Sequence, residues 1–195
     1  MKIIATDLDG TLFKGETLIN GVKESILELR NNNIEIYFTT NNSSQSPSEI
    51  REKLVSLLNL EIDINKIITP LIICKDFFSK KFDKLYIYGT DGIKKYIETL
   101  NIKTVSLDKS EAILIGRKEI NDNHEIEDIV SLVRSGTKIY CLNKDLTYPT
   151  ELGEQPGNGA VVKIIEDELS INIESLGKSG ELYPSYFTNN EIRID

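Results

Sequence analysis

A short apolar stretch that ends in two aspartates constrains the fold of this chain most. Residues 3–8, Ile-Ile-Ala-Thr-Asp-Leu, are mostly apolar or β-branched and stop at Asp9-Gly10. Such a stretch is typical of a strand buried on both faces of a parallel sheet. Asp7 and Asp9 would then lie at the carboxyl end of that strand. Packing rarely places two charges there, so we expect both residues to serve chemistry.

Two carboxylates separated by one leucine need a cation if an anion is to bind beside them. Asp7 and Asp9 have unperturbed pKa values of about 4, so at neutral pH they repel each other and any phosphate. Mg²⁺ prefers oxygen ligands and removes that repulsion. The pair therefore predicts a magnesium site that handles phosphate. The alternative is that Asp9 only caps a helix or an Asx turn.

Strands and helices alternate along the first part of the chain. Asn20 can cap a helix that ends at the asparagines of residues 31–33, and residues 34–39 form a second apolar strand. Residues 46–49, Ser-Pro-Ser-Glu, make a capping box that starts a second helix, and residues 64–69 predict a third strand. The order β-α-β-α-β is typical of a Rossmann-like, doubly wound α/β fold with a parallel sheet.

The same alternation restarts near Pro70, which predicts a second, smaller α/β unit. No linker rich in glycine and serine separates the two units, so we expect short hinges near Pro70 and Leu176. The expected helices cover residues 71–78, 91–101, 125–134 and 159–168, and the expected strands cover residues 84–88, 112–116, 138–142 and 171–176.

Composition excludes several classes of partner. A formal net charge of −8 argues against nucleic acids and anionic membranes, because their binding needs clustered Lys and Arg. Cys74 and Cys141 lie in apolar segments without a CxxC partner, which predicts buried free thiols. We find no export signal and no apolar run long enough for a membrane span, so we expect a cytoplasmic protein.

Residues 7–12, Asp-Leu-Asp-Gly-Thr-Leu, resemble the first motif of phosphatases of the haloacid dehalogenase (HAD) superfamily. The resemblance implies that Asp7 attacks the phosphoryl group and forms an aspartyl-phosphate. It implies that Asp9 protonates the leaving oxygen and then activates water. It also implies that Mg²⁺ is held by the Asp7 side chain and the Asp9 backbone carbonyl.

Two further motifs follow in the expected order. Residues 39–43, Thr-Thr-Asn-Asn-Ser, resemble the second HAD motif, which implies that Thr40 and Asn41 bind the phosphoryl oxygens. The sequence of this segment is most similar to subfamily IIA, the NagD-like and p-nitrophenylphosphatase-like branch. Gly177-Lys178 resembles the third motif, whose lysine neutralises the phosphoryl group. Without the resemblance, residues 39–43 would be interpreted as a loop that caps a helix, and Lys178 as a solvated side chain.

Subfamily IIA inserts an α/β cap between its second and third motifs. The resemblance therefore implies a HAD core of residues 1–69 and 175–195 and a cap of residues 70–174. Asp145 would contact the leaving group of the substrate and set specificity, although a turn residue is an equal alternative. A closing cap would exclude water from the site. The resemblance leaves open a homodimer formed through the cap.

The fourth motif, which supplies the remaining metal carboxylates, is not recognisable. We expect either a truncated chain or a degenerate stub in which Asp195 ligates the metal. A helix after Lys178 is poorly supported because Pro184 interrupts it. The only histidine, His124, precedes a predicted helix, where we expect a solvated capping residue rather than a catalytic one.

Together the patterns predict a Mg²⁺-dependent phosphatase that hydrolyses a phosphate monoester of a small molecule through an aspartyl-phosphate. The alternative is a catalytically impaired or truncated relative that binds a phosphorylated ligand without turnover. Phosphoryl transfer to a sugar instead of water would use the same Asp7 chemistry and also stays open.

Overall fold

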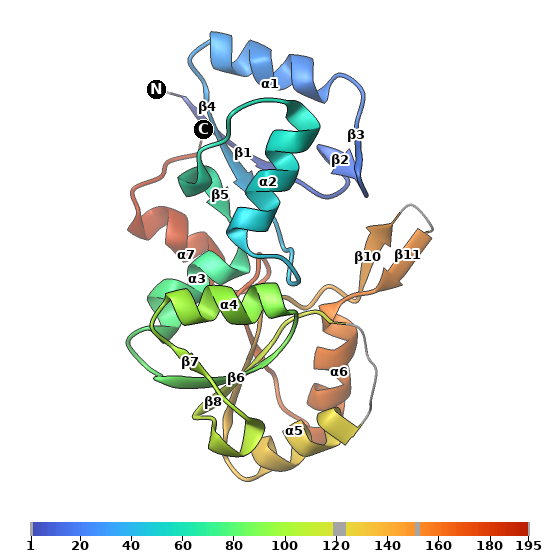
Figure 1. Ribbon diagram of the computed structural model, residues 1–195, viewed down its shortest axis with the longest axis vertical. Helices are drawn as coiled ribbons and strands as arrows, with labels where there is room; N and C mark the ends of the chain where they lie inside the picture. Colours follow the sequence, from blue (N-terminus) through green and yellow to red (C-terminus); the bar gives the residue numbers. More distant parts are fainter. Residues whose placement is uncertain (1, 119–123, 151–152, 195) are drawn as a thin grey trace.

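The computed structural model describes residues 2–118, 124–150 and 153–194 of the chain. Two parallel sheets lie one above the other in Figure 1, and helices cover them. The upper sheet has the order β1-β4-β5, and the lower sheet has the order β12-β9-β8-β6-β7. The predicted α/β fold class is thus confirmed. None of the described helices combines the length and apolarity that a membrane span needs.

The upper sheet carries the first motif at one edge strand. Strands β1 and β4 pair in parallel from Ile3↔Glu35 to Asp7↔Thr39, so Asp7 and Thr39 lie side by side where both strands end. The helices α1 and α2 pack on this sheet through Ile26, Leu54 and Leu58. The elements are β1 (Ile3–Asp7), α1 (Val22–Asn31), β4 (Glu35–Thr39), α2 (Pro47–Leu58), the short helix η1 (Ile64–Lys66) and β5 (Ile67–Ile68).

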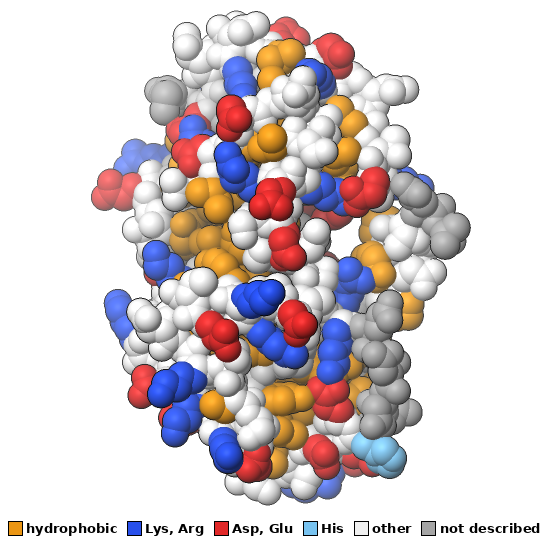
Figure 2. All heavy atoms as spheres, in the orientation of Figure 1, with side chains coloured by type: hydrophobic (Ala, Val, Ile, Leu, Met, Phe, Trp, Pro, Cys, Tyr) orange, Lys and Arg blue, Asp and Glu red, His pale blue; other side chains and the backbone are white. Residues whose placement is uncertain are grey.

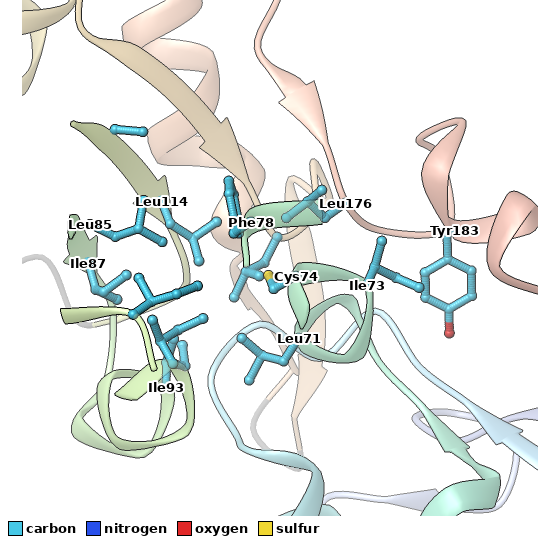
Figure 3. Close-up of a cluster of buried hydrophobic side chains, with 14 of the residues drawn as sticks. Leu71, Ile73, Cys74, Phe78, Leu85, Ile87, Ile93, Leu114, Leu176 and Tyr183 are labelled. Carbon is cyan, nitrogen blue, oxygen red and sulfur yellow. The ribbon is translucent and has the colours of Figure 1, made fainter. Parts of the chain in front are cut away.

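The lower sheet has helices on both faces. One apolar cluster joins α3, α4 and α7 to the face that carries Leu85 and Leu114 (Figure 3). Another cluster joins α5 and α6 to the face that carries Ile113 and Ile115. The strands are β6 (Lys84–Tyr88), β7 (Lys103–Thr104), β8 (Ala112–Ile115), β9 (Lys138–Cys141) and β12 (Glu174–Ser175). The helices are α3 (Pro70–Phe78), α4 (Asp91–Thr99), η2 (Leu107–Lys109), α5 (His124–Arg134), α6 (Asn158–Leu169) and α7 (Leu182–Asn189).

The apolar cluster in Figure 3 contains residues from both units. Ile68 from β5 and Tyr183 from α7 belong to it together with Leu85 and Leu114. The Tyr183 hydroxyl donates to the backbone carbonyls of Ile68, at 2.7 Å, and Thr40, at 3.3 Å. These bonds tie α7 to the upper sheet. The domain boundaries expected from the sequence stay a prediction.

Three local expectations are corrected. Gly21 with φ 84, not Asn20, precedes α1, and no side-chain bond caps that helix. Proline does not prevent α7, because Pro184 is its third residue and lies in the first turn, where backbone N–H groups need no partner within the helix. The third strand is shorter than expected, because η1 occupies part of it.

Other local predictions are confirmed. Ser46 and Glu49 form the expected capping box of α2, with Pro47 at the first helical position. Cys74 and Cys141 are free and buried. Two hairpins were not predicted. They are β2 (Phe13–Lys14) with β3 (Thr17–Leu18), and β10 (Thr147–Thr150) with β11 (Gly153–Pro156), which projects from the lower unit in Figure 1.

Candidate active site

A cleft of about 910 Å³ lies between the two units. Ends of strands from both sheets contribute to its wall, with Asp7, Asp9 and Thr40 on one side and Arg117 and Asp145 on the other. Acidic and basic side chains are interspersed on the face shown in Figure 2, without one dominant patch of either sign. A second hollow, of about 480 Å³, contains none of the predicted site residues.

Asp7 and Lys178 form an ion pair at the end of β1. The Lys178 Nζ donates to Asp7 Oδ1 and also to the backbone carbonyl of Thr39, at 3.3 Å. The two residues are 171 positions apart in the sequence. The Asp7 side chain keeps 44% of its surface exposed. The carboxylate is therefore held by a cation and still open to the cleft.

Asp9 occupies a different electrostatic environment from Asp7. Gly10 adopts φ 83, and its N–H donates to the Phe13 carbonyl at 2.8 Å, so the chain turns directly after Asp9. Partial desolvation by the surrounding protein raises the pKa of the Asp9 carboxyl, and the negative charge of Asp7 raises it further. Lys53 and the hydrogen bond from Thr40 oppose the shift. Because Asp9 is exposed to solvent in the cleft, its charge is screened, and the free energy that corresponds to this pKa shift is small.

Thr40 and Asn41 follow β4, the strand beside β1. Thr40 is buried, and its hydroxyl donates to Asp9 Oδ2 at 3.2 Å. The Asn41 Oδ1 accepts a 2.7 Å bond from the Lys178 backbone N–H. Gly177 permits this approach, because a Cβ there would lie 2.8 Å from Asn41 Oδ1. The second and third motifs therefore meet at one point.

Asn41 also connects this point to the lower unit. The Asn41 Nδ2 donates to both carboxylate oxygens of Asp145, at 3.1 and 3.0 Å. The backbone carbonyl of Asn41 accepts a bond from Asn143 Nδ2. The Asp145 loop is held in turn by Asn158, whose Nδ2 donates to the Asn143 carbonyl at 2.9 Å. Gly159 N donates to the Asp145 carbonyl at 2.8 Å. The structure thus places Asp145 at the cleft, and its role in specificity stays a prediction.

The sequence patterns did not identify two residues of the cleft wall, Lys53 and Arg117. Lys53 on α2 pairs with Glu16 at 3.0 Å and acts on the Asp9 carboxyl. Arg117 follows β8, with its guanidinium 3.9 Å from the ring centroid of Tyr148 on β10. Lys53 reads as an ordinary helix-surface lysine. Arg117, in contrast, follows a buried strand directly, which is the signal that identified Asp7 and could have identified it too.

Two positions named in the sequence analysis remain, Asp195 and His124. Asp195 lies outside the described residues. The His124 side chain is 83% exposed at the start of α5, and its Nδ1 lies 3.3 Å from Glu127 Oε2. Among residues 2–118, 124–150 and 153–194, no three His, Cys, Asp or Glu side chains cluster as metal ligands.

Comparisons with known proteins place the chain in a family. The model of haloacid dehalogenase-like hydrolases matches residues 4–103. An acid sugar phosphatase of Staphylococcus epidermidis is 29% identical over 174 residues, which cover 88% of this chain and 67% of the relative.

Two solved structures share the fold. One is a p-nitrophenyl phosphatase from Archaeoglobus fulgidus, with 21% identity and a TM-score of 0.86 over 96% of this chain and 72% of that one. The other is a glycerol phosphate phosphatase from Mycobacterium tuberculosis in complex with magnesium, with 22% identity and a TM-score of 0.84 over 98% of this chain and 58% of that one. This chain thus spans less than two thirds of the mycobacterial protein. The chain belongs to the haloacid dehalogenase-like hydrolase family, and its fold is that of the p-nitrophenyl phosphatase neighbour.

Proposed function

We propose that this protein is a phosphatase that hydrolyses phosphate monoesters of small molecules, with Asp7 as the nucleophile. The observation that carries the proposal is the Asp7–Lys178 ion pair at the open end of β1. The lysine holds the carboxylate in place, while 44% of the aspartate side chain stays exposed to the cleft. Phosphoryl transfer needs an oriented nucleophile and compensating positive charge, and this pair supplies both.

Asp9 is suited to the role of acid and base. Its raised pKa favours the protonated form more than an exposed aspartate would, so it can donate a proton to the leaving oxygen. The resulting carboxylate can then take a proton from the water that hydrolyses the aspartyl-phosphate. Thr40 holds the carboxyl through its 3.2 Å bond. The different surroundings of Asp7 and Asp9 thus separate the nucleophile from the acid.

Phosphate oxygens would be bound by Thr40, Asn41 and Lys178. The Thr40 hydroxyl and the Lys178 ammonium lie beside the two carboxylates. In this arrangement the Lys178 charge and the Thr40 hydroxyl would lie beside the phosphoryl group before the reaction begins. Asp145, held by Asn41, would contact the alcohol part of the ester.

Magnesium fits the donors that this end of β1 provides. Mg²⁺ in phosphoryl-transfer sites is held through one or two carboxylates, with water and substrate oxygens completing its shell. The Asp7 side chain and the Asp9 carbonyl would hold it, and Asp195 remains the candidate for a further ligand. When bound, the ion supplies positive charge that offsets the phosphate and the carboxylates. The magnesium complex of the mycobacterial neighbour supports this choice.

The test measures phosphate release from p-nitrophenyl phosphate with and without Mg²⁺. We expect Asp7→Asn to reduce kcat by at least about a thousandfold, because removal of a covalent nucleophile has effects of this order. The matched control is Asp167→Asn, which removes an exposed aspartate whose described ionic partner is Lys163 on α6. Peptide mass spectrometry after acid quench should find a phosphoryl group on the peptide that contains Asp7.

Two results would contradict the proposal. Activity that persists in Asp7→Asn would exclude Asp7 as the nucleophile. Calorimetric binding of a phosphate ester and Mg²⁺ by the wild type, without turnover of any ester tested, would favour a protein that binds phosphorylated ligands and does not hydrolyse them.

A further inference from the structure

The lower sheet has the strand arrangement at which doubly wound sheets generally bind ligands. Strand β6 pairs with β7 on one side and β8 on the other, and β8 pairs next with β9. After β6 the chain passes through α4 to β7, whereas after β8 it passes through α5 to β9 on the opposite face. Adjacent strands whose connections leave in opposite directions open a crevice at their carboxyl ends, where doubly wound sheets bind ligands.

The residues that follow β6 and β8 line the cleft described above. Thr90 follows β6, Arg117 and Lys118 follow β8, and all three belong to the cleft wall together with Asp7 and Asp9. The cleft therefore receives the carboxyl ends of two parallel sheets. One sheet contributes the proposed phosphoryl chemistry, and the other contributes cationic side chains that this chemistry does not use.

Arg117 is held by three contacts. Its backbone N–H donates to the Ser43 carbonyl at 2.7 Å, and its Nη2 donates to Ser44 Oγ at 2.9 Å. The guanidinium carbon lies 3.9 Å from the centroid of the Tyr148 ring. Stacking and a hydrogen bond fix the plane of the guanidinium before any ligand binds. Because arginine has five N–H donors, most of them remain for a ligand.

Arg117 differs from the other cations of the cleft wall in its charge balance. Lys53 pairs with Glu16 at 3.0 Å, and Lys118 pairs with Glu125 on α5. Within the described part of the chain, no carboxylate lies within 4.0 Å of the Arg117 side-chain nitrogens. A partly buried guanidinium that is fixed in place and lacks an anion favours binding of a planar or tetrahedral oxyanion.

We propose that Arg117 binds a second anionic group of the substrate, a carboxylate or a second phosphate on the alcohol part of the ester. This inference rests on the proposed phosphatase function and narrows its substrate class to esters whose leaving alcohol is itself negatively charged. Tyr148 positions Arg117, and Ser44 orients its fork. The specificity of the site then comes from Arg117 together with Asp145.

The test compares three esters of one carbon skeleton. Glycerol 3-phosphate has a neutral alcohol, 3-phosphoglycerate replaces the distal hydroxymethyl group with a carboxylate, and glycerol 1,3-bisphosphate carries a second phosphate. We expect kcat/KM for at least one anionic ester to exceed that for glycerol 3-phosphate by about tenfold or more, the effect of a charge-assisted hydrogen bond. Whichever ester benefits identifies the anion as carboxylate or phosphate.

Arg117→Met should remove this advantage: it should lower kcat/KM for the favoured anionic ester about tenfold more than kcat/KM for p-nitrophenyl phosphate, because the latter ester has no second anion. Lys118→Met is the matched control, since it removes an adjacent positive charge that already has a carboxylate partner. This variant should keep the advantage. Arg117→Lys should restore part of it, because a lysine keeps the charge and loses the fork.

Calorimetric titration of the wild type and Arg117→Met with the same esters separates this inference from the proposed function. Absence of turnover would contradict the phosphatase assignment, whereas the ratio of dissociation constants would still report on Arg117. The inference is overturned if the wild type binds neutral and anionic esters equally. It is also overturned if Arg117→Met weakens both kinds of ester by the same factor, since this would indicate a purely structural role.

Discussion

Replacing Asn41 with aspartate tests the link between the two units. The Asn41 amide nitrogen lies 3.1 and 3.0 Å from the two carboxylate oxygens of Asp145. In Asn41→Asp both hydrogen bonds are lost and two carboxylates face each other, while the bond from the Lys178 backbone N–H can persist, because it uses the side-chain oxygen. The substitution therefore changes one side of Asn41 only.

The expected cost follows from exposure and distance. Loss of a hydrogen bond to a charged group costs roughly 1.5 kcal/mol at the lower end of its range, which applies because Asp145 is exposed. Repulsion between two unit charges about 4 Å apart adds about 1 kcal/mol in water. We expect Asn41→Asp to lower the free energy of unfolding by roughly 2–3 kcal/mol.

Urea unfolding followed by circular dichroism measures these values, because the chain has no tryptophan to report by fluorescence. The decisive variant exchanges the partners. Asn41→Asp combined with Asp145→Asn places a donor opposite an acceptor again and should recover most of the lost stability. High salt should reduce the loss of stability in Asn41→Asp, because it screens the repulsion between the two carboxylates. If the exchanged pair is no more stable than Asn41→Asp alone, the two side chains do not interact as described.

Two further predictions concern stability. The pKa of Asp9 is raised above 3.8, so the folded state binds its proton more tightly than the unfolded state does, and stability falls as pH rises through the folded pKa. In metal-free buffer Asp9→Asn should therefore have a higher free energy of unfolding than the wild type at pH 7. This difference should vanish below pH 3.8, where the aspartate is protonated in both states. A difference that stays constant across this pH range would contradict the raised pKa. Leu54→Ala should cost about 2–5 kcal/mol in urea unfolding, because Leu54 is fully buried between α2 and the upper sheet. A loss below about 1 kcal/mol would mean that this side chain is not packed as described.

Local sequence patterns predicted the regular elements that bury one face. The strand Lys84–Tyr88 has the bounds expected from its apolar residues, and α2 begins at the proline of its capping box. Both signals lie within a few residues, so they do not depend on the rest of the chain. The hairpin β10–β11 escaped notice because Pro149 and Pro156 lie in its strands, where proline normally argues against a strand.

The residues of the candidate site also differ in whether a local sequence pattern identifies them. Asp7 and Asp9 were identified because their position is encoded within one strand and its turn, and Thr40 because it directly follows the neighbouring strand. Lys53 reaches the cleft only through the tertiary packing of α2, which no local pattern encodes, whereas Arg117 follows strand β8 and could have been identified from that position. The Asn41–Asp145 contact spans 104 residues, and its partners could be named singly but not as a pair. The roles of all these residues stay predictions.

The position of Asn41 links the proposed chemistry to the closure of the cleft. Its side chain bonds the backbone of Lys178, the cation beside Asp7, and also Asp145, on the far wall. An opening of the cleft that breaks the second contact would leave the Asn41 amide free to turn, and the Lys178 loop would lose a fixed acceptor. The cation would then be held least firmly when water enters the cleft. Closure by a ligand that engages the far wall would instead restore both contacts, so binding energy from the alcohol part of an ester would be spent on positioning Lys178.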